Sequence, residues 1–319
     1  MSTAALSNPV FTNEKAALKH LEASRWPDGP YCPHCGSVNV HRMGGETQKG
    51  MFLCNDCRDK FTARVGTVLE RSHIPVHKWL LAIHLLSSSK KGCSTHQLHR
   101  SLGITYKSAW FMAHRIREAM KPGRNTPPLG GEGKIVEADE TYSGQTEERP
   151  TRTTKGNKFT KRGRGGPSGK RAVLALVERG GNVRSFHLKH ATADSVSDAL
   201  YRNVARRSTL HTDESRLYTL VGKEFGEHET VTHSKKEYVR GDVHTNTVEG
   251  FFSIFKRGMK GIYQHCGEAH LQRYLAEYDF RYNYRVALGY NDTDRANEAL
   301  KGITGKRLTY RRPSEAAHA

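Results

Sequence analysis

The chain has 319 residues, enough for two or three domains with their own cores. Its 51 lysines and arginines exceed its 32 aspartates and glutamates, for a formal net charge of +19, so a polyanionic partner such as nucleic acid is expected. The sequence has no apolar run near the length of a membrane span and no secretory signal pattern, which argues against a membrane role and predicts a reducing cytoplasm.

Residues 12–25 predict a short helix, which Thr12 or Asn13 can cap. Trp26 and Pro27 end it. Residues 31–66 follow as short strand-like runs between glycine-containing turns, and they hold four of the six cysteines.

These four cysteines form two CxxC pairs separated by 18 residues. Each pair can present two thiolates at a tight turn, and two such turns build a tetrahedral site of the kind that zinc prefers. Four thiolates leave no open position, so the zinc would be structural. Gly36 suits the first turn, whereas Arg58 stands at the equivalent place in the second. Disulfides or unrelated thiols are the alternative, which a reducing compartment disfavours. The predicted ligands are Cys32, Cys35, Cys54 and Cys57.

Three helices are predicted next, at residues 76–88, 94–100 and 105–120, with a turn at Gly103 between the last two. The last two fit a helix-turn-helix whose second helix presents basic side chains to DNA. An ordinary helical hairpin with a solvated basic face explains this segment equally well by itself. The ribbon before it and the charge of the chain favour DNA binding. The predicted DNA contacts here are Lys107 and Arg115, beside Tyr106 and Ser108.

The rest of the chain alternates strands and helices after a linker at 123–133. A polar, basic stretch at 143–170 predicts a mobile loop, and the glycines at 180 and 181 predict a hairpin. The expected strands are 134–141, 171–178, 183–190, 208–214 and 229–234. The expected helices are 194–206, 246–260 and 268–285.

Three acids stand where an acid is locally unfavourable. Asp139 and Asp213 each end a predicted strand, and Glu249 lies in an apolar-flanked helix. Carboxylates of this kind can hold magnesium, and two such ions can clamp the oxygens of a phosphoryl transfer. Each acid could instead cap a turn or face solvent. Glu140 and Glu214 are rivals to the two aspartates, and because adjacent strand residues point to opposite faces, only one of each pair can face the site. The aspartates are preferred because a short side chain on a rigid strand positions a metal better. Glu137 shares the face of Asp139 and could support it.

The chain resembles bacterial insertion-sequence transposases of the DDE type with an N-terminal zinc ribbon. The resemblance rests on YCPHCG, VEADETYSG, LHTDESRLY, HTNTVEGFFSIFKRGMKGIYQHC and YLAEYDFRYNYR, and it covers most of residues 15–290. It implies an RNase H-like fold, Asp139, Asp213 and Glu249 as the acidic triad for two Mg²⁺ or Mn²⁺ ions, and DNA cleavage followed by strand transfer. Related enzymes carry a basic residue seven positions after the glutamate, here Lys256, and in some an asparagine replaces the glutamate, here Asn246.

The resulting expectation is a multidomain transposase: a zinc ribbon at 1–66, a helix-turn-helix region at 67–122, an α/β RNase H-like catalytic domain at 123–305 and a basic tail at 306–319. Its partners would be transposon inverted repeats, target DNA and a second copy of the chain, in a bacterial cytoplasm near the nucleoid. A non-catalytic DNA-binding regulator and an RNase H-like nuclease remain alternatives. The expected phosphate contacts are Lys256, Arg257, Lys260 and the loop at 149–171.

Overall fold

The computed structural model describes residues 5–123, 125–146, 169–235 and 237–309, and these form two compact units. The first unit is Met1–Lys121 together with Gly289–Ala319, and the second is Pro122–Leu288. The second unit thus ends at Leu288, whereas the catalytic domain expected from the sequence extends to residue 305. A helix that no sequence pattern indicated, α8 (Asp292–Lys301), packs against α2 (Val76–Ser88) in the first unit.

The first unit begins with short 3₁₀ turns and α1 (Glu14–Arg25), whose Asn13 side chain accepts the N–H of Ala16. A three-stranded antiparallel sheet follows, in the order β1-β2-β3. Trp26 holds α1 to this sheet, because its buried ring packs edge-on against Phe52 and Phe61 at 5.4 and 5.9 Å. The strands are β1 (Val40–Arg42), β2 (Met51–Cys54) and β3 (Lys60–Thr62).

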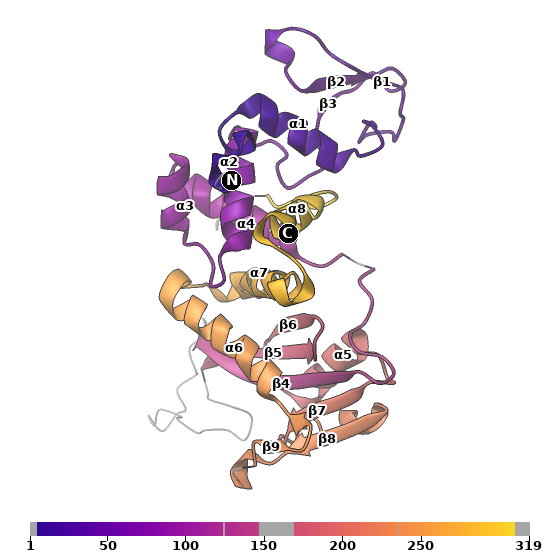
Figure 1. Ribbon diagram of the computed structural model, residues 1–319, viewed down its shortest axis with the longest axis vertical. Helices are drawn as coiled ribbons and strands as arrows, with labels where there is room; N and C mark the ends of the chain where they lie inside the picture. The colour runs from indigo at the N-terminus through magenta and orange to yellow at the C-terminus, as the bar shows by residue number, and fades with distance from the viewer. Residues whose placement is uncertain (1–4, 124, 147–168, 236, 310–319) are drawn as a thin grey trace, which may run out of the picture. The chain divides into compact units, whose positions relative to one another are not determined.

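The predicted helix pair is present as α3 (Thr95–Leu102) and α4 (Tyr106–Met120). Ser94 caps α3 and Thr105 caps α4 through their hydroxyls. Gly103 between them adopts a left-handed φ of 57°, a conformation that glycine allows at little cost. Local sequence signals thus set the start of each helix and the turn between them. Helix α8 lies beside α4 (Figure 1).

The second unit is built on a five-stranded mixed sheet in the order β6-β5-β4-β7-β8. Strands β4, β5 and β6 are antiparallel neighbours, whereas β7 and β8 add on in parallel. The predicted glycine hairpin joins β5 to β6, with Val177 opposite Val183. The strands are β4 (Ile135–Gln145), β5 (Lys170–Glu178), β6 (Val183–Leu188), β7 (Thr209–Asp213) and β8 (Glu227–Val231).

Strand β4 runs further than expected, so residues 143–145 are extended strand and not loop. The rest of the predicted basic loop, residues 147–168, lies outside the described residues. A small hairpin that the sequence did not indicate, β9 (Val239–Arg240) with β10 (Val243–His244), precedes the next helix.

Helices cover both faces of the sheet (Figure 1). Helix α5 (Ala193–Asn203) packs on the face that carries Val136, Ala138 and Leu210. Helices α6 (Asn246–Gly258) and α7 (Leu271–Asn283) pack on the opposite face, where Val173, Ala175 and Val177 meet Phe251 and Phe255. Because side chains alternate along a strand, Glu137 and Asp139 of β4 belong to the α6 face. Short 3₁₀ and π turns lie between the strands and helices of this unit or follow α7: Val221–Glu224, His233–Lys235, Met259–Tyr263, Glu268–His270 and Val286–Leu288.

The outer edge of β6 is closed by side chains of α7. Asp279 accepts the N–H of Ser185 at 2.9 Å, and the Asn283 amide both accepts from and donates to the backbone of Val183. Gln272 binds the backbone of His187 and Ser185 in the same way. These bonds satisfy edge groups that would otherwise be free to pair with another chain.

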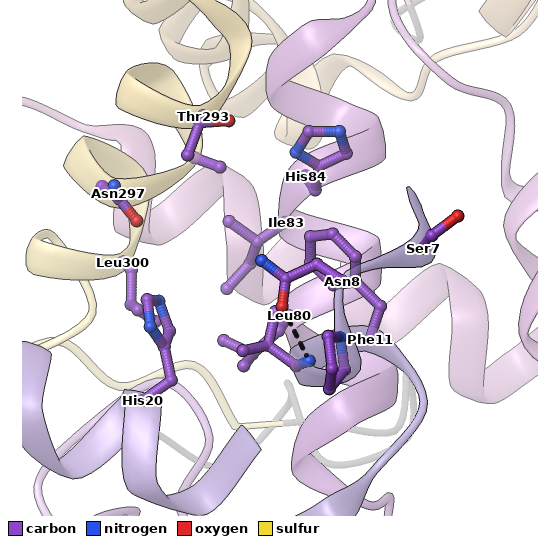
Figure 2. Close-up of a pocket in the computed structure, with 13 residues that line it drawn as sticks. Ser7, Asn8, Phe11, His20, Leu80, Ile83, His84, Thr293, Asn297 and Leu300 are labelled. Carbon is purple, nitrogen blue, oxygen red and sulfur yellow. Dashed lines mark hydrogen bonds between the residues drawn. The ribbon is translucent and has the colours of Figure 1, made fainter. Parts of the chain in front are cut away.

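The first unit contains a cavity of about 350 Å³ (Figure 2). Phe11, Ile83 and Leu300 provide apolar walls, and His20 and His84 provide polar edges. The side chain of Asn8, at its mouth, accepts the N–H of Val10. No helix in the described parts of the chain is both long enough and apolar enough to span a membrane.

Candidate metal and catalytic sites

The four predicted zinc ligands meet at one point. Their sulfur atoms all lie within 4.8 Å of one another, with Sγ–Sγ distances of 3.7 Å from Cys32 to Cys57 and 3.6 Å from Cys35 to Cys54. Zinc–sulfur bonds of about 2.3 Å place the sulfurs of a tetrahedral site about 3.8 Å apart, so this set fits zinc. The site is closed, as a structural zinc site requires.

Local backbone geometry explains how each turn holds its thiolates. The N–H of Gly36 bonds to the carbonyl of Cys32, and the N–H of Arg58 bonds to that of Cys54. Gly36 has a φ of 80° and Arg58 a φ of 64°, so the second turn adopts the left-handed conformation without a glycine. Backbone N–H groups, that of Cys57 first, lower the pKa of the Cys54 thiol to about 7, which favours a thiolate.

Asp139 and Asp213 stand at matching positions on neighbouring parallel strands. Ile135 of β4 pairs with Thr209 of β7, an offset of 209 − 135 = 74 residues, and the same offset takes Asp139 to Asp213. The residues that alternate with them, Ala138 and Leu210, face α5, so both aspartates face α6. The structure therefore brings the first two predicted acids to one side of the sheet.

The charge of Asp139 is strongly disfavoured in this structure. Burial, and after it the negative charges of Asp213, Glu140 and Glu249, raise the pKa of Asp139 to about 8, although the N–H of Glu140 opposes the shift. Burial also raises the pKa of Asp213, against the N–H of Ser215 and the charge of His233. For both aspartates the described residues supply no lysine or arginine as a counter-charge. A divalent cation would provide it.

Glu249 lies in the first turn of α6 and is half exposed. Its Oε1 accepts the hydroxyl of Thr245 at 3.1 Å and lies 3.9 Å from Nε2 of His233. Its charge acts on Asp139, but among the described residues the carboxylates of Asp139, Asp213 and Glu249 do not all lie within 4.8 Å of one another. The three predicted acids thus do not form one compact cluster in this structure. Asn246, the alternative third residue, is exposed at the first position of α6.

The rival acids point elsewhere. Glu140 accepts the hydroxyl of the fully buried Tyr218 at 2.7 Å on the α5 side of the sheet. Glu214 is exposed and accepts the N–H of Ser234. The expectation that neighbouring acids on a strand face opposite sides therefore agrees with the observed positions of Asp139 and Glu140.

The predicted DNA-binding residues differ in their exposure. Lys107 is exposed at the start of α4, and Lys256 and Arg257 are exposed on α6. Arg115 differs, because its guanidinium donates to the carbonyls of Glu70 and Leu308 and stacks on Phe111. These bonds hold Arg115 within the first unit. Lys260 is exposed after α6, and most of the loop at 149–171 lies outside the described residues.

Two residues near the acids were not singled out from the sequence. His233 approaches Glu249 and lowers the pKa of Asp213, and Arg179 binds Glu137, Asp242 and His244. Neither lies in a distinctive motif, and the chain contains 18 histidines, so no sequence signal distinguished them. Only the fold brings them to this side of the sheet.

Family models match the chain in the two places that these sites occupy. A transposase zinc-ribbon domain matches residues 12–60, and an ISXO2-like transposase domain matches residues 128–283. The protein is therefore a transposase with a zinc ribbon before its transposase domain. A protein of the transposable element ISH50 from Halobacterium salinarum is 32% identical over 256 residues, which cover 78% of this chain and 84% of that protein. The chain belongs to the ISXO2-like transposases of insertion elements.

Similarity to solved structures is distant. The intasome of simian T-cell lymphotropic virus with the regulatory subunit B56 gamma matches at a TM-score of 0.29 and 14% identity, over 57% of this chain and 63% of that one. A pre-cleavage Mos1 transpososome matches at a TM-score of 0.20 and 12% identity, over 59% and 72%. This chain thus spans just under two thirds of the first of these chains, and scores this low carry no structural argument.

Proposed function

We propose that this transposase cuts the ends of its mobile element and joins them to target DNA with two Mg²⁺ or Mn²⁺ ions held by Asp139, Asp213 and Glu249. The main support is that Asp139 and Asp213 occupy matching positions on one face of the sheet, where neither has a lysine or arginine partner among the described residues. The mixed sheet with helices on both faces supports an RNase H-like fold.

The division of labour follows from the positions of the acids. Short side chains on adjacent strands of a packed sheet keep Asp139 and Asp213 at a fixed separation, whereas Glu249 on α6 is freer to adjust. Bound ions of this type activate an attacking water or 3′-hydroxyl and stabilise the leaving oxygen, so no side-chain nucleophile is needed. The raised pKa of Asp139 favours its protonated form, so a cation held there would displace that proton.

DNA recognition is assigned to the first unit. The zinc ribbon and the α3–α4 pair, as a helix-turn-helix, would bind the terminal inverted repeats, with Lys107 at the start of α4 exposed for phosphate or base contact. In the second unit, Lys256 and Arg257 lie about two turns after Glu249 on α6 and suit phosphates close to the acids. Pairing of two ends would require at least a dimer.

The test is cleavage of DNA carrying the element's ends by wild-type protein and by Asp139→Ala, Asp213→Ala and Glu249→Ala. Each variant should retain end binding in a gel-shift assay and lose cleavage by at least about 10³-fold. Asp198→Ala, which removes an exposed acid on α5, is the matched control and should cut normally. Wild-type cutting by Asp213→Ala would refute the assignment. Cleavage without a strand-transfer product would instead indicate a nuclease, and binding without any cleavage a regulator.

A further inference from the structure

The N-terminus of α6 is capped from another element. Thr245, at the N-cap position, makes no side-chain bond to the helix N–H groups, and its hydroxyl bonds to Glu249 instead. Glu137 of β4 takes its place: Oε2 accepts the N–H groups of Thr247 at 2.8 Å and Val248 at 3.0 Å. Two N–H groups that a helix leaves unpaired are thus satisfied by an acid about 110 residues earlier in the chain.

The second oxygen of Glu137 is equally engaged. Oε1 accepts the hydroxyl of Thr247 at 2.7 Å and Nε of Arg179 at 3.0 Å, and Nδ1 of His244 lies 3.3 Å away. The Glu137 side chain has no exposed surface. A buried carboxylate is stable only with such partners, and the positive end of a helix dipole adds to them. We call this buried set of contacts from Glu137 of β4 to Thr247 and Val248 of α6 the clamp.

We infer that Glu137 is a positioning residue that fixes the separation of Asp139 and Glu249. It lies two residues before Asp139 on the same strand face, and the N–H of Val248 that it binds belongs to the residue before Glu249. The clamp therefore joins the backbone segments that carry two of the three acids. This inference rests on the proposed function, because it assigns Glu137 the task of shaping that metal site.

Replacing Glu137 by glutamine tests the clamp at constant size. An amide has one acceptor oxygen, so it cannot serve both the two backbone N–H groups and the Thr247 and Arg179 donors. Glu137→Gln in the zinc-loaded full chain should weaken Mn²⁺ binding about tenfold in a titration followed by electron paramagnetic resonance, as loss of a supporting partner does at metal sites. The Mg²⁺ concentration that gives half-maximal cleavage should rise by a similar factor.

Three further variants separate the effect of the clamp on Mn²⁺ affinity from effects on general stability. Asp279→Asn alters another fully buried acid, which binds Ser185 on β6, and should leave Mn²⁺ affinity unchanged. Thr247→Val removes only the hydroxyl donor and should weaken Mn²⁺ binding by about two- to threefold, whereas Thr247→Ser should match wild type. If Glu137→Gln does not fold, the comparison of Thr247→Val with Thr247→Ser tests the clamp.

The outcomes separate this inference from the proposed function. Wild-type Mn²⁺ affinity in Glu137→Gln or Thr247→Val, alongside its loss in Asp139→Asn, would overturn the role of Glu137 and leave the metal site standing. Equal, negligible Mn²⁺ binding by wild type and Asp139→Asn would overturn both. A graded loss, with Asp279→Asn unaffected, supports the clamp.

Discussion

The hydroxyl of Tyr218 donates to Oε2 of Glu140 at 2.7 Å, and this bond turns Glu140 toward α5, away from the face of Asp139. Tyr218 is fully buried, and the only other side-chain donor to Glu140 among the described residues is Ser215, at 3.5 Å. Two adjacent acids on β4 thus have different environments: Glu140 accepts the hydroxyl of a tyrosine, whereas the donor to Asp139 among the described residues is the backbone N–H of Glu140.

Tyr218→Phe should therefore destabilise the second unit by about 1–3 kcal/mol, because Glu140 loses its main donor while it stays largely buried. Urea unfolding followed by circular dichroism measures the change. Tyr201→Phe removes a hydroxyl from an exposed tyrosine on α5 and serves as the control. Equal stability of the two variants would show that the Tyr218–Glu140 bond contributes nothing.

The raised pKa of Asp139 predicts a pH-dependent cost of folding without magnesium. The ordinary pKa is 3.8 and the folded value is about 8, so the folded state keeps a proton that the unfolded chain releases. The stability that this proton contributes is fully present below pH 4 and is lost as pH rises toward 8. Relative to Asp139→Asn, which does not titrate, wild type should lose roughly 4 kcal/mol between pH 5 and pH 8.

Hydrogen exchange of the β4 and β5 amides, measured with and without Mg²⁺, checks this prediction. Magnesium should restore protection in wild type above pH 8 and leave Asp139→Asn unchanged, since a bound cation favours the charged carboxylate. A wild-type protein whose protection relative to Asp139→Asn is the same at pH 5 and pH 8 would contradict the assigned shift.

The third acid can be identified by comparing Glu249→Gln with Asn246→Ala. Glu249 acts electrostatically on Asp139, whereas Asn246 is exposed at the start of α6. A carboxylate binds Mg²⁺ better than an amide. Glu249→Gln should therefore lose cleavage by at least about 10²-fold, and Asn246→Ala should stay within about threefold of wild type. Single-turnover cleavage at saturating Mg²⁺ gives both rates, and the reverse ranking would assign the role to Asn246.

Features set by short-range chemistry were predictable from the sequence. The spacing of Cys32, Cys35, Cys54 and Cys57 determined their convergence, because each pair is closed by its own turn. Gly103 and Thr105 marked the turn and the start of α4 for the same reason. Alternation along β4 indicated that Asp139 and Glu140 face opposite sides of the sheet, but it did not indicate which of them faces the site.

Features set by distant contacts were not predictable. Glu137 was expected only to support Asp139, and its bonds to Thr247 and Val248 depend on how α6 packs on the sheet. Helix α8 has few apolar positions, chiefly Ala299 and Leu300, so its pattern was too weak to predict a helix or its place in the first unit. Arg115 was expected to meet DNA because the sequence did not reveal which face of α4 is covered.

Zinc removal should unfold the ribbon. Trp26 packs on Phe52 and Phe61, so its fluorescence reports whether the β1–β3 sheet is intact. Cys54→Ser should lower the zinc content from one ion per chain toward none and shift Trp26 emission to that of an exposed indole, since small zinc domains do not fold without metal. Cys93→Ser, which changes a buried cysteine outside the cluster, is the control. Native emission in zinc-free protein would show that the aromatic core suffices.

Arg115 and Lys107 should respond differently to substitution, although both are basic residues of α4. Arg115 donates to the carbonyls of Glu70 and Leu308, so Arg115→Ala leaves two part-buried acceptors without their donor and should destabilise the first unit by about 1–3 kcal/mol. Lys107→Ala should leave stability unchanged and weaken DNA binding, lowering the slope of log K against log salt by about 0.9. Thermal unfolding and salt-dependent gel shifts separate the two effects. If Arg115→Ala were as stable as wild type and lowered the salt slope as Lys107→Ala does, Arg115 would be assigned to DNA contact.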